Sequence, residues 1–185
     1  MASNVRGFLF VDYVRMIRSR KDVDWKKHFL PQDMAILASS VDPDGWYPMA
    51  TFERFGLAIL REIAHGQLEG VRMWGRFQLD PVRKHFPTLV AEGDPRDSMM
   101  RFRVLADSFF DSGTLSVESV EDDHAVVAID YGMSASAEET ASYQSLGFFE
   151  RLVEVSGGKN VDARFKTKAW DGADKTLLDL HWELD

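Results

Sequence analysis

The stretch that decides the fold is VDARFKTKAWDGADKTLLDLHWEL, residues 161–184. Apolar and charged residues alternate over residues 161–166, and the same two-residue period returns over residues 178–184. Successive side chains of a strand point to opposite faces of a sheet, so each half is predicted to be a strand with one apolar and one polar face. The turn-forming residues 170–174, WDGAD, predict that the two strands form a hairpin.

A second hairpin is predicted upstream of this one. Residues 114–120 alternate in the same way, an acidic turn follows at residues 121–123, and residues 125–131 are rich in valine and isoleucine. Between the two hairpins, residues 137–155 carry apolar side chains at helical spacing, and a glycine pair then ends the helix. The order is ββαββ, which predicts a four-stranded antiparallel sheet with one solvent-exposed face and one face covered by the helix.

The residues before this unit show helical periodicity. Helices are predicted over residues 5–19, 32–39, 50–64, 68–76, 81–90 and 96–111, with a strand over residues 100–105 as an alternative. Pro81 is interpreted as a helix start and Pro87 as a kink. We therefore expect an α+β protein with one domain, residues 1–185, in which a helical lobe (1–112) packs on the ββαββ lobe (113–185).

Composition narrows the class of protein. The chain has 185 residues, 45% of them hydrophobic, which is enough for one sizeable core. A net charge of −8 argues against nucleic-acid binding, which needs clustered positive charge. The absence of cysteine excludes disulfides, thiolate metal sites and a thiol nucleophile. No membrane-spanning run or signal peptide is found, so a cytoplasmic location is expected.

The sequence shows no catalytic or metal-binding motif. The five histidines are dispersed, without the His-x-His or His-x-x-x-His spacing that places two imidazoles on one metal. No Gly-x-Ser-x-Gly turn or phosphate-binding glycine loop occurs. We therefore predict neither catalytic residues nor metal ligands.

Several short motifs carry a resemblance to known families. They are Trp46-Tyr47-Pro48 before a long helix, Gly75-Arg76, Leu146-Gly147-Phe148-Phe149 and Gly157-Gly158. In this order they resemble an uncharacterised family of about 200 residues found mainly in myxobacteria. More distantly, the chain is similar to the superfamily of heme-NO-binding, 4-vinyl-reductase-type and Bet3-like domains. That resemblance implies a helical lobe on a sheet, an apolar cavity between them, and binding of a ligand or protein partner without catalysis.

The resemblance also bears on cofactors. The heme-binding branch carries a Tyr-x-Ser-x-Arg signature and a proximal histidine, whereas this sequence has no such triplet and only His85 near the corresponding region. The expectation from the sequence is that no cofactor is bound and that heme is doubtful.

The predicted function is a non-enzymatic regulatory or sensory binding module, with an apolar cleft between lobe and sheet for a small apolar ligand or a protein partner. The pocket candidates are Trp46, Tyr47, Phe55, Trp74, His85, Phe102, Phe109, Phe148 and Phe149. One alternative is a homodimeric protein-interaction or scaffold subunit without a ligand. The other is an enzyme with a dispersed site built from His85, Arg76 and Glu92.

Overall fold

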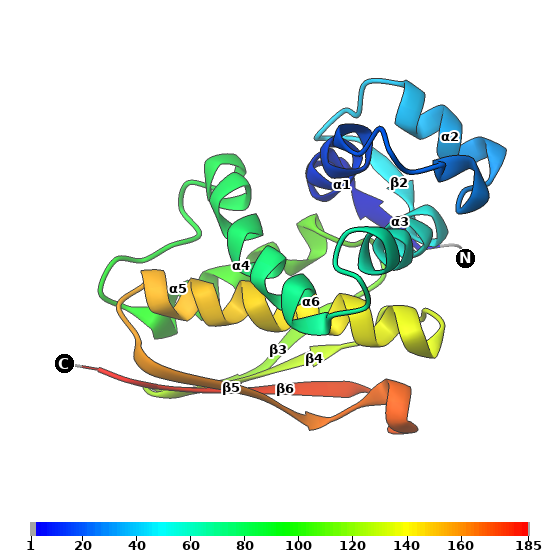
Figure 1. Cartoon of the computed structure of the whole chain (residues 1–185). Coiled ribbons are helices and arrows are strands. Elements are labelled where there is room, and N and C mark those ends of the chain that lie inside the picture. Colours follow the sequence, from blue (N-terminus) through cyan, green and yellow to red (C-terminus); the bar gives the residue numbers. More distant parts are fainter. Residues whose placement is uncertain (1–2, 185) are drawn as a thin grey trace.

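The computed structural model describes residues 3–184 and has a layered α+β architecture. Figure 1 shows the four-stranded sheet as one layer, helix α6 lying across it, and the N-terminal helices on the far side of α6. The predicted fold class is confirmed, with a helical N-terminal lobe packed on an antiparallel sheet. Among the described residues, no helix combines the length and apolarity needed to cross a membrane.

The helical lobe precedes the ββαββ unit in the chain. Its elements are β1 (Asn4–Arg6), α1 (Gly7–Ser19), α2 (Pro31–Ala38), β2 (Trp46–Pro48), α3 (Met49–Glu62), α4 (Leu68–His85) and α5 (Pro95–Leu105). The ββαββ unit consists of β3 (Leu115–Val120), β4 (His124–Ile129), α6 (Ala135–Val155), β5 (Lys159–Thr167) and β6 (Thr176–Glu183). Short 3₁₀ turns occupy Trp25–Lys27, Ala106–Ser108 and Ala169–Asp171.

The large sheet has the strand order β3-β4-β6-β5, and all its pairings are antiparallel. Val117, Val127, Leu178 and Leu180 on its apolar face are buried. The residues that alternate with them on β6 are partly or fully exposed. The predicted amphipathic strands are therefore confirmed, because alternation along a strand is a local signal that needs no knowledge of its partners.

Helix α6 is buried on more than the one face that the sequence predicted. Its buried positions include polar residues such as Ser142, Gln144 and Glu150. The reason is that α6 is sandwiched between the sheet and α4 (Figure 1). The α4–α6 crossing is close because a glycine from each helix lies in it: a Cβ added to Gly75 would lie 1.9 Å from the carbonyl oxygen of Gln144, and one added to Gly147 would lie 1.9 Å from that of Arg72.

Several predicted boundaries in the helical lobe are wrong. Residues predicted as two helices form the single helix α4, which continues through Pro81. The backbone nitrogen of Pro81 cannot bond the carbonyl of Phe77, but Phe77 is an exposed position, where water can take that bond. Pro87 lies beyond the end of α4 and kinks no helix.

The start of the first predicted helix is the strand β1, which pairs with β2 in a short ribbon. The last predicted helix ends at Leu105, and Phe110 instead bridges to Val5 of that ribbon. Three-residue strands are too short to show periodicity in a sequence, so this ribbon was not predicted.

Candidate functional site: two spaces on either side of Gln78

The first space is an interior cavity between the helical lobe and the α6–sheet layer. Its volume is about 30 Å³. Most of its walls are aromatic or aliphatic, and the lining residues are Leu9, Phe52, Gln78, Phe102, Phe109, Phe110, Leu115, Tyr131, Gln144, Ser145, Phe148 and Phe149. A space of this size holds about one or two water molecules. The phenylalanine rings therefore close on one another and leave only a small void.

A chain of buried hydrogen bonds reaches the wall of this cavity. The Tyr13 hydroxyl donates to Oε1 of Gln144 over 2.5 Å, and Nε2 of Gln144 donates to Oε1 of Gln78 over 2.7 Å. The chain ends at Nε2 of Gln78, which has no hydrogen-bond partner among the described residues although Gln78 is only 6% exposed. Buried polar groups are nearly always paired, and the cavity that Gln78 lines has room for a water molecule as the partner of this donor.

Tyr131, which lines the cavity, and Tyr13, which is linked to its wall through Gln144, are neutral hydrogen-bonding groups. Burial raises the pKa of the Tyr13 hydroxyl well above its ordinary value. Burial also raises the pKa of Tyr131, whose hydroxyl is 2.6 Å from the Ser145 hydroxyl. Neither hydroxyl can act as a base near neutral pH, so the cavity has no proton-abstracting tyrosine.

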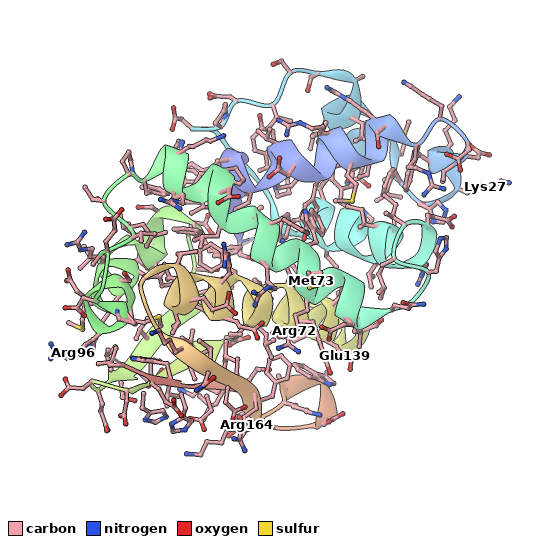
Figure 2. All side chains as sticks on the ribbon, turned by 60° about the vertical axis from the view of Figure 1, so that its left-hand side comes forward. Lys27, Arg72, Met73, Arg96, Glu139 and Arg164 are labelled. Atoms are coloured by element: carbon pink, nitrogen blue, oxygen red, sulfur yellow. The ribbon has the colours of Figure 1, made fainter. Side chains whose placement is uncertain are left out.

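The second space is an open groove between α1 and α4, with a volume of about 780 Å³. Figure 2 shows these two helices near each other at one end and diverging toward the other, with α6 on the other side of α4. The lining residues are Phe8, Val11, Asp12, Arg15, Met16, Ser19, Pro43, Trp74, Phe77, Gln78, Pro81, Lys84 and His85. The volume lies within the usual range of small-molecule sites, about 300–1,000 Å³.

The groove combines an aromatic floor with charged groups. Phe77 is 67% exposed, which is a large exposed fraction for a phenylalanine side chain. Arg15 pairs with Asp12 over 3.3 Å, and Lys84 lies at the same groove. Burial raises the pKa of Asp12, partly offset by Arg15. Gln78 lines both the groove and the interior cavity, so it forms the wall between them.

The nine pocket candidates from the sequence divide between these places. Phe102, Phe109, Phe148 and Phe149 line the interior cavity. Trp74 and His85 line the groove.

The remaining three candidates lie in neither space. Phe55 is fully buried in the helical core against Phe10 and Phe29. Trp46 and Tyr47 belong to β2, where Tyr47 accepts a hydrogen bond from the backbone of Asp42. A ligand-binding role for the nine stays a prediction.

Sequence reasoning missed Tyr13, Gln78 and Gln144, which carry the buried hydrogen-bond chain. The available signal was a polar residue at a position where helical spacing predicts an apolar one.

His85 and Arg76, two members of the dispersed enzyme site considered above, face different neighbours. The His85 ring stacks on Phe8 with centroids 4.8 Å apart, and its Nε2 lies 3.5 Å from the Asp44 carboxylate. Arg76 instead pairs with Glu150 and Glu154 of α6. The structure therefore gives these two side chains no shared acid–base arrangement.

Comparisons with known proteins give a fold but no close relative. No protein-family model matches the sequence, and no curated protein matches it significantly. Solved structures do match. An H-NOX protein from S. oneidensis in the Fe(II)NO ligation state aligns with a TM-score of 0.66 and 10% identity, covering 96% of this chain and 99% of that chain. The chain has the H-NOX fold.

Two further H-NOX structures agree. The Fe(II) unliganded protein from K. algicida gives a TM-score of 0.62 at 11% identity, with 97% of each chain covered. A structure that probes heme distortion in the H-NOX family gives 0.60 at 11% identity, covering 97% of this chain and 95% of that one. The distant likeness to heme-NO-binding domains predicted from the sequence is confirmed at the level of the fold.

The expectation of no cofactor needs correction. These structural neighbours are H-NOX proteins described in Fe(II) states or by their heme, which contradicts the expectation. The inference from the sequence relied on a missing short motif. A fold that persists at 10% identity does not keep every motif, so the missing motif was a poor reason to set heme aside.

The two spaces differ in whether they fit a heme. The interior cavity of about 30 Å³ is far below the size of a usual cofactor site, and no histidine lines it. The groove has the room and the residue types: His85 offers an imidazole of the kind that binds heme iron, and Arg15 and Lys84 offer cations for carboxylates.

Proposed function

We propose that this chain is a non-enzymatic sensory domain that binds a small molecule in the groove between α1 and α4. The observation that carries the proposal is the unpaired Nε2 of Gln78, in the wall of a groove of about 780 Å³. A ligand with a hydrogen-bond acceptor would satisfy this donor once the Gln78 side chain turns Nε2 from its buried position toward the groove. The H-NOX fold supports a binding role, since the structures that share it are described by their bound iron or heme.

The groove defines the class of ligand. Phe8, Trp74 and Phe77 provide aromatic surface for a flat apolar body. Arg15 and Lys84 provide positive charge for an acidic group. The proposed ligand is therefore a planar apolar molecule that carries carboxylates, and heme belongs to this class.

A bound heme would supply an iron centre able to take up a diatomic gas. The chain's own residues would hold the cofactor: the imidazole of His85 would bind it, and Arg15 and Lys84 would pair with its carboxylates.

The hydrogen-bond chain offers a route from the ligand to the rest of the fold. Oε1 of Gln78 accepts from Gln144 on α6, and Gln144 in turn accepts from Tyr13 on α1. A ligand that accepts a hydrogen bond from Nε2 of Gln78 would reorient the Gln78 amide. That amide is bonded to Gln144 on α6, which is bonded in turn to Tyr13 on α1. We expect such a ligand to change the packing of α4 on α6.

The first experiment asks whether the protein binds such a ligand. The protein is purified from cells, analysed by native mass spectrometry and visible absorption, and then titrated with hemin. We expect a saturable heme absorption band that is lost or shifted in His85→Ala. The matched control His65→Ala should behave as wild type, because His65 lies in the α3–α4 turn, away from the groove.

Gln78→Met removes the donor together with the oxygen that accepts from Gln144, so it tests the whole side-chain amide. Net contributions of single hydrogen bonds are about 0.5–1.5 kcal/mol, so affinity should fall roughly 2- to 13-fold. The proposal fails if no molecule co-purifies and hemin binding is absent or equal in wild type and His85→Ala.

A protein partner is the second candidate, because α4 exposes Met73 as well as Phe77 beside the groove. Met73 and Phe77 are four residues apart, which places them on one face of α4, and a contiguous exposed apolar patch marks an interaction surface. Light scattering at high concentration tests the homodimer form of this idea. A strict monomer, unchanged by Met73→Ser, would contradict it.

A further inference from the structure

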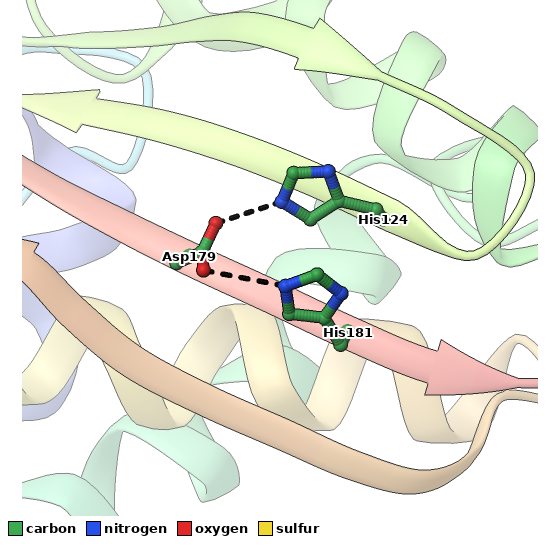
Figure 3. Close-up of side chains that lie close together, drawn as sticks. All are labelled: His124, Asp179 and His181. Carbon is green, nitrogen blue, oxygen red and sulfur yellow. Dashed lines mark hydrogen bonds and ion pairs between the residues drawn. The ribbon is translucent and has the colours of Figure 1, made fainter.

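Two histidines and an aspartate meet on the face of the sheet that is turned away from α6. His124 on β4 pairs directly with His181 on β6, and Asp179 lies two residues before His181 on the same strand. Residues two apart on one strand and directly paired residues on adjacent strands share a face. The three side chains therefore project together, as Figure 3 shows.

The contacts among the three are close and convergent. Nε2 of His124 lies 2.7 Å from Oδ1 of Asp179, and Nε2 of His181 lies 3.3 Å from Oδ2 of the same carboxylate. The two imidazole rings stack with centroids 4.1 Å apart and an angle of 10°. A ligand atom from each side chain lies within 4.8 Å of the others.

We propose that His124, Asp179 and His181 form a binding site for a divalent transition-metal ion of the zinc type. Two imidazoles and a carboxylate form a ligand set that such ions favour, at distances of about 2.0–2.2 Å. Tetrahedral ligands at that distance lie about 3.3–3.6 Å from one another. Both Nε2 atoms already face oxygens of one carboxylate, and metal binding requires side-chain rotations that turn the two stacked rings toward a common point.

The ion takes the place of the imidazole protons. Without metal, an Nε2–H of each histidine donates to Asp179, and the hydrogen bond from His124 is the main reason that the pKa of Asp179 is lowered. On metal binding, each neutral ring moves its proton from Nε2 to Nδ1 by exchange with solvent, so that Nε2 coordinates through its lone pair and Asp179 stays ionised; a ring that is doubly protonated beforehand releases one proton to solvent. His181 is 47% exposed on its side chain, so water completes the coordination.

The neighbouring strand adds two charges of opposite sign. Asp162 on β5 pairs in register with His181, and Arg164 pairs with Asp179. These two residues form an ion pair with each other, so the positive charge of Arg164 next to the site is largely compensated. The site lies apart from the groove and the cavity, and none of its three ligands lines either space.

The experiment is a titration of the metal-stripped full chain with zinc chloride by isothermal calorimetry. We expect one ion per chain, and at least a tenfold loss of affinity in His124→Gln, in His181→Gln and in Asp179→Asn. His65→Gln is the matched control and should bind zinc as wild type does. Circular dichroism confirms that each variant is folded.

Histidine ¹⁵N NMR gives a readout that does not depend on the variants. Zinc should move the ring signals of His124 and His181 and leave those of His28, His65 and His85 in place. The proposal is overturned if wild type binds no stoichiometric zinc, if the three ligand variants bind it as tightly as wild type, or if other histidines respond instead.

Discussion

The two faces of α4 are built in opposite ways. Toward α6 the helix is closed: Gly75 brings the backbones together, and Arg72 and Arg76 pair with Glu150 and Glu154 over 2.8 and 2.6 Å. Toward α1 the helix is open, with Trp74, Phe77 and His85 along a groove of about 780 Å³. Only the second face has room for another molecule.

Under the proposed function, one helix would both hold the fold together and recognise a ligand. Backbone-to-backbone contact tolerates no added atom, so the α4–α6 interface sets the position of the helix. The open face can then vary in side chains without disturbing the core. The expected effects of substitutions on the two faces differ accordingly.

The largest effect is expected behind the closed face, where Phe102 fills the interior. Phe102→Ala should lower the free energy of unfolding by about 3–5 kcal/mol, because it removes a fully buried ring and leaves a cavity. Urea denaturation measures this. The control Phe77→Ala on the open face should change stability by less than about 0.5 kcal/mol, because Phe77 is mostly exposed. Equal losses in the two variants would show that the interior is not packed as described.

The next effect is expected at the glycine crossing. Gly147→Ala places a methyl group against the backbone carbonyl of Arg72. Only a shift of the helix backbones can relieve this clash, so the free energy of unfolding should fall by about 3 kcal/mol. Gly70→Ala is the control: its Cβ would meet Ala64 at an ordinary 3.5 Å, and alanine suits a helix better than glycine. That variant should be as stable as wild type or more so. Thermal melts of both proteins that gave the same midpoint would contradict the close approach of the helices.

The smallest effect concerns the ion pairs of the closed face. Burial raises the pKa of Glu154, but hydrogen bonds from Arg76 and Arg151 outweigh it, so the net shift is downward. A lowered pKa means that the contribution to stability is present above the unfolded value of about 4.5 and is lost as pH falls through the folded value. At pH 7 the free energy of unfolding of wild type should exceed that of Glu154→Gln by about 1 kcal/mol.

The internal control for the Glu154 prediction is the same comparison at acidic pH. The two proteins should converge in denaturation curves as pH falls through the lowered pKa of Glu154, where the carboxyl in wild type becomes protonated. A difference that stays constant across this range would assign the effect to packing instead of charge.

The sequence predicted the parts of this fold whose signals are local. Strand alternation over residues 161–166 and 178–184 identified both strands, because each needs only its own side chains to be recognised. The continuity of α4 through Pro81 was missed because only tertiary packing decides it. The double burial of α6 was missed because small residues such as Gly147 and Ser142 have no apolar signature.

The candidate site was predictable only in part. Aromatic content showed that rings such as Phe102 and Phe149 would be buried, but not that they close on one another. The donor of Gln78 is unpaired only because of how Gln144 is oriented, which no sequence pattern encodes. His124 and His181 are far apart in the chain and meet only through the register of β4 on β6.

The strand order β3-β4-β6-β5 has a consequence for how the chain folds. Each outer strand pairs with its neighbour in sequence, whereas β4 and β6 are separated by the whole of α6 and β5. Loop-closure entropy makes such non-local pairing slow, so the two hairpins are expected to form before they join. His124 and His181 lie at this last junction. A metal ion there would bind only the chain whose sheet has closed, and zinc added during refolding would mark that step in time.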